Sequence, residues 1–216
     1  MVKVAILGFG TVGSGVAEVL TMNADNITRT SGREIGIKYI VDVREFPGNP
    51  FEKYMVKDFS LVENDPEVSI VVETIGGVGV AYEFSRRALM AGKSLITSNK
   101  ELVATHGHEL LSIAKEKGVN YLFEASVGGG IPVLRPLCQC LAANRIEEIY
   151  GILNGTTNYI LTEMITNVVS FEDALSQAQQ KGYAEQNPAA DIEGHDAGRK
   201  ICILSTLSSG VHIYPD

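Results

Sequence analysis

Short, nearly continuous apolar segments alternate with segments of helical periodicity through the first half of the chain. The expected strands cover residues 2–7, 35–41, 68–73, 93–97 and 119–123, and the clearest helices cover 81–91 and 102–117. Strands that are apolar throughout are typical of a parallel sheet, because right-handed crossover helices bury both of its faces. The pattern therefore predicts an α/β fold with a doubly wound parallel sheet.

Glycine and proline interrupt this alternation at Gly128, Gly129, Gly130 and Pro132. Beyond them the pattern predicts a strand over 146–153 and helices over 156–166, 171–180 and 196–207. We therefore expect a nucleotide-binding domain over 1–127 and a partial α+β substrate and dimerisation domain over 128–216. The segment 23–33 is expected to be a surface loop, because Asn, Thr, Ser and Gly dominate it.

Composition narrows the class of partner. The 216 residues include 18 Lys and Arg against 26 Asp and Glu, a net charge of −8. Nucleic acid and anionic membranes favour clustered basic residues, so neither is expected as a partner, whereas small metabolites remain candidates. Three cysteines without a C-x-x-C pair predict a reduced, cytoplasmic protein. Neither a signal peptide nor a membrane-spanning segment is predicted.

A glycine-rich turn between the first strand and the first helix predicts dinucleotide binding. Gly8, Gly10 and Gly13 form the pattern G-x-G-x-x-G. In a Rossmann fold the first glycine permits a tight turn, the second lets a pyrophosphate approach the backbone, and the third lets helix and strand pack closely. The helix N-terminus then offers amides to the phosphates. A turn whose glycines serve only packing is the alternative.

Polar residues at other strand ends are expected at the same edge of the sheet. Asp42 is suited to bind a ribose 2′-hydroxyl and favours NAD, whereas Arg44 is suited to pair with a 2′-phosphate and favours NADP. The interpretation leans to NADP and leaves NAD open. Thr74 and Ser98 are expected beside the cofactor, since ligands bind at the carboxyl ends of parallel strands. Lys100 is a candidate active-site lysine, with a surface lysine at a helix start as the alternative.

Four acids and a lysine gather around the start of an apolar helix within residues 182–200. Asp196 and Lys200 are four residues apart and head an otherwise apolar helical stripe. An amine can protonate a carbonyl oxygen during reduction, and carboxylates can hold an ammonium group, so the cluster suits an amino-acid substrate. A surface ion pair is the alternative. The turn 154–158, which includes Thr156, is suited to bind a carboxylate or a cofactor group, with an ordinary helix N-cap as its alternative.

Together these segments resemble the homoserine dehydrogenases. The resemblance runs through the whole chain and rests on residues 8–13, 73–77, 97–100, 124–132, 154–161 and 182–200. It implies the NAD(P)-dependent interconversion of L-homoserine and L-aspartate 4-semialdehyde by hydride transfer, in threonine, methionine and isoleucine biosynthesis.

Roles follow from the resemblance residue by residue. Lys200 is implied to protonate the aldehyde oxygen, and Lys100 to lie near nicotinamide and substrate. The implied substrate-binding residues are Glu185, Asp196, Asp191, Gly182 and Thr156. The implied cofactor-binding residues are Gly8, Phe9, Gly10, Thr11, Val12, Gly13, Arg44, Thr74, Ser98, Lys100 and Gly182. A monovalent cation site, usually sodium and structural in role, is implied at Glu124 and at the carbonyls of Val127, Gly129 and Ile131.

The chain departs from the family at its end. Family members continue past residue 216, so part of the substrate domain is expected to lie outside this chain. A homodimer is expected for the complete enzyme rather than for this chain alone. Two alternatives stay open. An aspartate dehydrogenase or another Rossmann amino-acid oxidoreductase would share residues 8–13 but not the cluster in 182–200, and a non-catalytic dinucleotide-binding module would bind cofactor without turnover.

Overall fold

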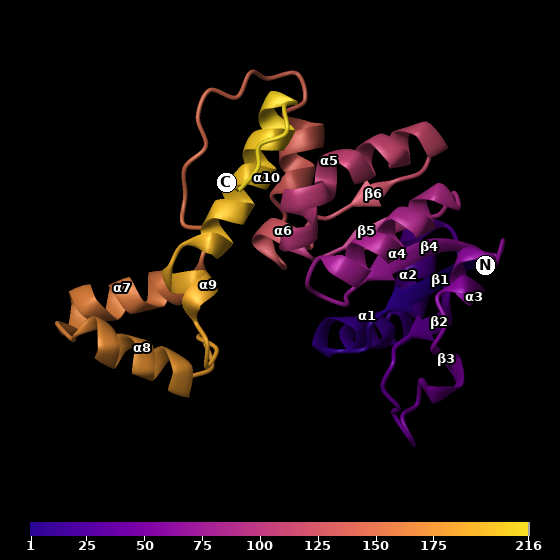
Figure 1. Ribbon diagram of the computed structural model, residues 1–216, viewed down its shortest axis with the longest axis horizontal. Helices are drawn as coiled ribbons and strands as arrows, with labels where there is room; N and C mark the ends of the chain where they lie inside the picture. The colour runs from indigo at the N-terminus through magenta and orange to yellow at the C-terminus, as the bar shows by residue number, and fades with distance from the viewer. Residues whose placement is uncertain (216) are drawn as a thin grey trace. The chain divides into compact units, whose positions relative to one another are not determined.

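The chain folds into two compact units (Figure 1). The computed structural model describes residues 1–215, and its contacts divide them into Met1–Gly129 and the residues from Gly130 onwards. The division expected at 127/128 lies next to this boundary.

The first unit is built on a six-stranded parallel sheet with the order β3-β2-β1-β4-β5-β6. Its strands are β1 (Val2–Leu7), β2 (Ile35–Val41), β3 (Met55–Val56), β4 (Val68–Glu73), β5 (Ser94–Thr97) and β6 (Tyr121–Leu122). This is the strand order of a Rossmann fold, so the doubly wound α/β prediction is confirmed. The order reverses between β1 and β4, which is where such sheets leave a crevice for a ligand.

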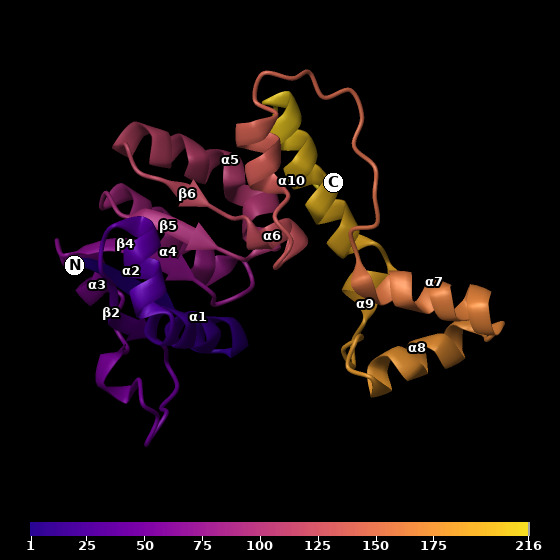
Figure 2. The ribbon, with the colours of Figure 1, turned by 180° about the vertical axis from the view of Figure 1, so that it is seen from behind.

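Helices cover both faces of this sheet. They are α1 (Thr11–Met22), α2 (Ala24–Ser31), α3 (Ser60–Glu63), α4 (Gly79–Met90), α5 (Lys100–Lys117), α6 (Ala125–Gly128) and the 3-10 turn η1 (Glu52–Tyr54). The two opposite views show α2 and α4 on opposite sides of the strands (Figures 1 and 2). Helix α2 corrects the loop expected over 23–33. Its polar sequence still forms a helix, which ends at Gly32 in the left-handed conformation.

The core of the first unit explains why its strands are mostly apolar. Ile6, Leu7, Ile40, Val71 and Leu95 have no exposed surface. Each lies on a strand covered on both sides, so neither face of the strand requires polar residues.

The second unit is helical in the residues that the structure describes. Its elements are the π-helical turn η2 (Pro136–Cys140) and the helices α7 (Gly155–Asn167), α8 (Phe171–Gln180), α9 (Ala189–Ile192) and α10 (His195–Ser209). Helices α7 and α8 pack around Ile160, Ala174, Ala178 and Ala184. The helices expected over 156–166, 171–180 and 196–207 are confirmed as α7, α8 and α10.

The strand expected over 146–153 is wrong. This segment has no regular structure, and Tyr150 and Ile152 are 87% and 76% exposed. An apolar pattern forms a strand only where a neighbouring strand takes its backbone hydrogen bonds, and residues 130–215 contain no other strand. The β component expected of 128–216 is therefore absent from the described residues.

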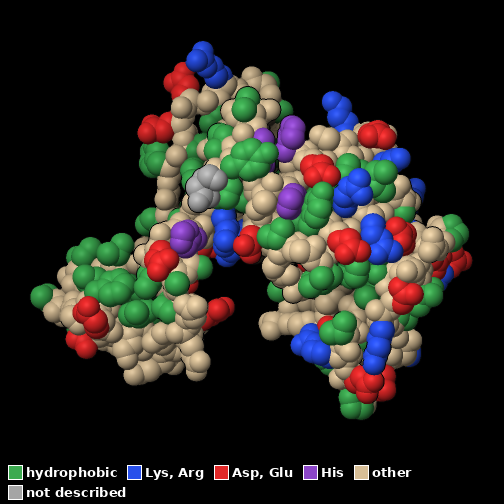
Figure 3. Space-filling model, in the orientation of Figure 1, with side chains coloured by type: hydrophobic (Ala, Val, Ile, Leu, Met, Phe, Trp, Pro, Cys, Tyr) green, Lys and Arg blue, Asp and Glu red, His purple; other side chains and the backbone are tan. Residues whose placement is uncertain are grey.

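Apolar side chains are also exposed on the second unit. They gather over the α7–α8 hairpin on the face drawn in Figure 3. Along α7 and at its end, Leu161, Ile165 and Val168 are more than half exposed. None of the helices within residues 1–215 has the length and apolar character needed to cross a bilayer.

Candidate functional site

The glycine-rich turn after β1 packs so closely against its neighbours that two of its positions have no room for a side chain. Gly8 has φ +88°, and a Cβ there would lie 2.9 Å from the Thr74 carbonyl oxygen. A Cβ on Gly13 would lie 2.0 Å from the Gly8 carbonyl oxygen, whereas a Cβ on Gly10 would meet nothing within 4 Å. Gly8 and Gly13 therefore serve close packing, and Gly10 faces open space that a ligand can enter.

The start of α1 adds a polar surface to this turn. The helix begins at Thr11 and its cap residue is Gly10, which has no side chain to bond the first-turn amides. Thr11 and Val12 are exposed there. Unused amides and the positive end of the helix dipole suit a pyrophosphate.

A cavity of about 670 Å³ lies beside the turn. It is lined by Gly8, Gly10, Val41, Asp42, Val43, Arg44, Lys57, Thr74, Ile75, Val80 and Phe84. These residues come from the carboxyl ends of β1, β2 and β4 and from the start of α4. A cavity of this size at the topological switch point fits part of a dinucleotide.

Asp42 links the end of β2 to the glycine-rich turn. Its carboxylate accepts a hydrogen bond from the Phe9 amide at 2.7 Å, and the Arg44 guanidinium donates to both of its oxygens at 3.0 and 2.8 Å. The Arg44 side chain, together with the Arg44 and Phe9 amides, lowers the pKa of Asp42 to about 2. The Arg44 side chain is 58% exposed, whereas the Asp42 side chain is 6% exposed.

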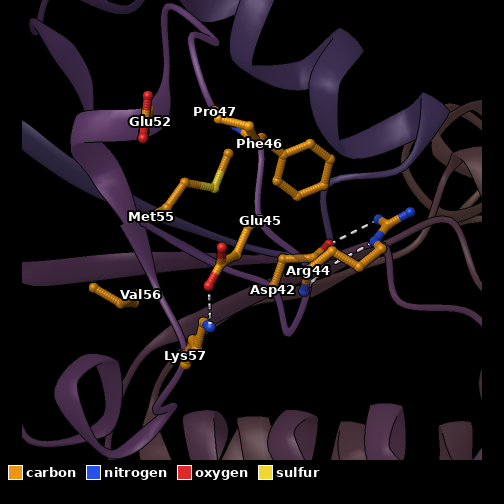
Figure 4. A pocket seen from close by; sticks show the side chains of 9 residues that line it. All are labelled: Asp42, Arg44, Glu45, Phe46, Pro47, Glu52, Met55, Val56 and Lys57. Atoms are coloured by element: carbon orange, nitrogen blue, oxygen red, sulfur yellow. Dashed lines mark hydrogen bonds and ion pairs between the residues drawn. The ribbon is translucent and has the colours of Figure 1, made fainter.

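A second cation at this end of the cavity, Lys57, was not predicted from the sequence. It follows β3, lines the cavity described above, and also lines a smaller cavity of about 280 Å³ next to it (Figure 4). Its Nζ pairs with Glu45 at 2.8 Å, and both side chains are exposed. Strand β3 has only two residues, so no hydrophobic pattern identified Lys57 as a strand-end residue.

The ends of β4 and β5 place the remaining predicted residues of this unit. The Thr74 hydroxyl lies within hydrogen-bonding distance of the Leu7 and Gly8 carbonyls, at 2.9 and 3.0 Å, and so braces the turn. Ser98 is half-buried just after β5. Lys100 is the first residue of α5 and is also half-buried.

In the second unit, Asn154 lies at the centre of a buried polar cluster. Its Nδ2 donates to Asp191 Oδ1 at 2.7 Å and to Asp196 Oδ2 at 2.8 Å. Its Oδ1 accepts hydrogen bonds from the amide and the hydroxyl of Thr157, so Asn154 is the N-cap of α7. The N-cap alternative for this turn is thus correct, but the same side chain also holds two carboxylates in place.

Lys200 completes the cluster. Its Nζ lies 2.9 Å from Asp196 Oδ2 and donates to the Leu153 carbonyl at 2.7 Å. The two charged side chains are only 15% and 3% exposed, so the surface ion-pair alternative is wrong. An ammonium group has three N–H donors, and these two contacts leave one of them for a ligand.

The other predicted residues of this unit lie around the cluster. The Thr156 hydroxyl is 2.9 Å from Asp191 Oδ2 and 2.8 Å from the Tyr183 carbonyl. Gly182, at φ +75°, and Glu185 lie on the exposed turn after α8, and the structure does not bring the Glu185 carboxylate into the hydrogen-bonded cluster. Their substrate roles stay predictions.

The predicted cation ligands lie around α6. Glu124 precedes this four-residue helix, Val127 is within it, and Gly129 follows it with φ +59°. The last carbonyls of a helix have no partner within it, and the cation role of these residues stays a prediction. Ile131 belongs to the second unit. Within residues 1–215 no group of three His, Cys, Asp or Glu side chains could hold a metal.

Comparisons with known proteins agree on one family. The model of the homoserine dehydrogenase NAD-binding domain matches residues 8–124, and the homoserine dehydrogenase model matches residues 132–216. The homoserine dehydrogenase of Neisseria gonorrhoeae is 45% identical over 97% of this chain and 48% of its own length.

Solved structures give the same result. A homoserine dehydrogenase from Thiobacillus denitrificans is 44% identical, with a TM-score of 0.89 over 97% of this chain and 49% of that one. A hyperthermophilic archaeal homoserine dehydrogenase in complex with NADPH is 30% identical, with a TM-score of 0.84 over 98% of this chain and 70% of that one. The chain spans about half the length of the curated relatives it matches. It belongs to the homoserine dehydrogenase family.

Proposed function

We propose that this chain takes part in the NAD(P)-dependent interconversion of L-homoserine and L-aspartate 4-semialdehyde. The observation that carries the proposal is the buried cluster in which Lys200 is held by Asp196 and by the Leu153 carbonyl. A dinucleotide-binding module without catalysis has no need of a buried lysine and two carboxylates far along the chain from the glycine-rich turn. Burying charged groups is costly, so the cluster indicates a function beyond folding.

Lys200 acts as the proton donor in this proposal. Two of its three N–H groups are engaged, at 2.9 and 2.7 Å, and these contacts direct the third. A positioned ammonium group protonates the aldehyde oxygen as the carbon is reduced, and the resulting amine removes the proton in the reverse direction. When NAD(P) is bound, its nicotinamide would supply or accept the hydride.

The carboxylates next to Lys200 suit an amino-acid substrate. Asp191 and Asp196 place two carboxyl groups in the cluster that contains Lys200, and such groups suit the ammonium group of homoserine. Thr156 adds a hydroxyl beside Asp191, at 2.9 Å. We assign Glu185 and Gly182 to the same substrate, and Lys100 to the vicinity of the nicotinamide, on the family resemblance.

For the cofactor we propose NADP in preference to NAD. Arg44 and Lys57 place two cations at the ribose end of the cavity, and the Asp42 carboxylate that would bind a 2′-hydroxyl already accepts from Arg44. A 2′-phosphate is negatively charged and forms ion pairs with Arg and Lys, whereas a 2′-hydroxyl is neutral and gains little from them. Arg44→Ala should raise the Kd of NADPH about tenfold while changing that of NADH little. Equal weakening of both cofactors in fluorescence titrations would remove Arg44 from this role.

We propose further properties on the resemblance alone. The oxygen donors of Glu124, Val127, Gly129 and Ile131 suit a monovalent cation such as sodium, with a structural role. A cytoplasmic location and a homodimer of the complete enzyme belong to the same proposal.

The function is tested by following NADPH formation at 340 nm with L-homoserine, with L-aspartate as the substrate of the aspartate dehydrogenase alternative. NADPH is titrated in parallel. Turnover with L-homoserine only is expected. Turnover with L-aspartate would favour the other oxidoreductase, and NADPH binding without turnover would favour the non-catalytic module.

A further inference from the structure

A buried carboxylate at the end of β4 is not explained by cofactor or substrate binding. Glu73 has no exposed surface. It is the last residue of a mostly apolar strand and pairs with Leu7 on β1 and Thr97 on β5. A buried carboxylate costs several kcal/mol unless donors surround it, and an apolar residue would fill the same place in the sheet without that cost.

The donors to Glu73 come from the two segments that border the cofactor cavity. Oε1 accepts from the Ile75 amide at 2.7 Å and from the Gly76 amide at 3.4 Å. These amides belong to the turn after β4, where Thr74 and Ile75 line the cavity. Oε2 accepts from the Thr97 hydroxyl at 2.5 Å, at the end of β5.

The hydrogen bonds continue from Thr97 to the start of α5. The Thr97 hydroxyl oxygen accepts from the Asn99 amide at 2.9 Å. The Asn99 side chain donates to the Gly77 carbonyl at 2.6 Å and accepts from the Leu102 amide at 3.1 Å, which caps α5. One carboxylate therefore connects the turn after β4 with the helix start on which Lys100 is the first residue.

We propose that Glu73 is a positioning residue, which fixes the turn 74–77 against the cofactor and, through Thr97 and Asn99, fixes the backbone that carries Lys100. The part that concerns Lys100 rests on the proposed function. The direction of the hydrogen bonds favours a side chain at position 73 that only accepts. The Thr97 oxygen already accepts from Asn99, so its proton needs an acceptor, and an amide at position 73 would present a donor to one of its neighbours.

The test uses paired variants in the full chain. Thr97→Val removes the hydroxyl at nearly constant shape, Thr97→Ser keeps it, and Glu73→Gln removes the charge. Ser85→Ala is the matched control, because the Ser85 hydroxyl is buried on α4 and has no hydrogen-bond partner among the described residues. The measurements are kcat and KM with L-homoserine, the Kd of NADPH, and unfolding in urea.

Thr97→Val should lower kcat about tenfold or more, since a hydrogen bond to a charged group is lost, while the Kd of NADPH changes less than about threefold. Thr97→Ser should restore kcat, and Ser85→Ala should leave it unchanged. In a Lys100→Ala background Thr97→Val should have little further effect on kcat, because both changes act through the same group. A purely structural role would instead give equal losses in both backgrounds and overturn the proposal.

The cofactor part of the proposal is read without turnover. Glu73→Gln should raise the Kd of NADPH at least about fivefold, because the turn 74–77 loses its acceptor. An unchanged Kd in a folded Glu73→Gln protein would overturn this part. If the unaltered chain binds NADPH but does not oxidise L-homoserine, the proposed function fails, and the Kd of Glu73→Gln still decides whether Glu73 positions the turn. Should Glu73→Gln not fold, Glu73→Asp replaces it in this titration, because it keeps a carboxylate but shortens the reach to the Ile75 amide. An unchanged Kd of NADPH in Glu73→Asp would likewise overturn this part.

Discussion

The two units hold their polar sites in different ways. In the first unit, a large apolar core supports a parallel sheet, and the site is made mainly of backbone at strand ends, where Gly8 and Gly13 exclude side chains. In the second unit, a small core around Ile160 supports helices, and the site is a buried side-chain cluster centred on Asn154. The first site should therefore be more sensitive to added atoms than the second, and the second more sensitive to the removal of functional groups.

The largest expected effect tests whether chemistry belongs to the second unit. Lys200→Met removes the ammonium group at similar length, so kcat with L-homoserine should fall about 10²- to 10⁴-fold, the usual contribution of a general acid. The Kd of NADPH should stay unchanged, because the dinucleotide cavity lies in the first unit. Lys181→Met is the control, since Lys181 is an exposed lysine of the second unit that donates to the Tyr159 hydroxyl. Normal turnover in Lys200→Met would exclude Lys200 as the proton donor.

A second prediction tests the claim that added atoms disrupt the first site. Gly13→Ala would place a Cβ 2.0 Å from the Gly8 carbonyl oxygen, so the turn must shift. We expect a loss of roughly 1–3 kcal/mol in the free energy of unfolding, together with loss of NADPH binding. Gly10→Ala meets nothing within 4 Å, so stability should stay nearly constant while the Kd of NADPH rises about tenfold or more.

Gly15→Ala provides the control for both changes. It lies in α1, its Cβ would also meet nothing within 4 Å, and it should stabilise the protein by about 0.5–1 kcal/mol through helix propensity. Urea unfolding and NADPH titration separate the three variants. If Gly10→Ala bound NADPH normally, the open space at Gly10 would not be where the pyrophosphate approaches.

A third prediction tests the claim that removed groups disrupt the second site. Asn154→Ala loses the cap of α7 and the two bonds to Asp191 and Asp196, so we expect a loss of about 2–3 kcal/mol and a higher KM for L-homoserine. Ser170→Ala removes the cap of α8 and a hydrogen bond to the Asp173 side chain, and it should cost about 1 kcal/mol without changing KM. If the two variants had equal effects in urea unfolding and kinetics, Asn154 would be only a helix cap and would have no role in substrate binding.

The difference between the units also explains what the sequence could predict. Strands β1, β2 and β4 have the bounds expected from their apolar runs. A strand buried on both faces consists mostly of consecutive apolar residues, and such a run can be recognised in the sequence. The same reasoning failed over 146–153, where an apolar pattern exists but the described residues offer no strand to pair with. Strand β3 has two residues, too few to form a pattern.

The sequence predicted contacts between candidate residues where the two residues have complementary chemistry and lie close together along the chain. Asp196 and Lys200 lie four residues apart on one helix, so their pairing followed from the sequence. The bonds from Asn154 to Asp191 and Asp196 span 37 and 42 residues, and no local pattern signals such contacts. Lys57 also lines the cofactor cavity only because of how the chain folds, and no local sequence pattern predicts this position.

The smallest expected effect compares the two units at one backbone conformation. Val168 ends α7 with φ +54°, in the left-handed region that a β-branched residue rarely adopts, and its side chain is exposed. Gly32 ends α2 in the same region, at φ +71°, and a Cβ there would meet nothing within 4 Å. Val168→Asn should therefore stabilise the protein, and Gly32→Val should destabilise it, each by about 1–2 kcal/mol.

Urea unfolding of both variants shows whether the free-energy cost of a left-handed β-branched residue depends only on its own backbone conformation or also on the unit that contains it. Changes of equal size and opposite sign would show that the left-handed residue costs the same in a unit with a large core and in one with a small core. A loss at Gly32→Val without a gain at Val168→Asn would mean that the end of α7 relaxes in solution and that the strain at Val168 is not retained. The small core of the second unit would then determine the backbone geometry at its helix ends, as well as the amount of apolar surface it buries.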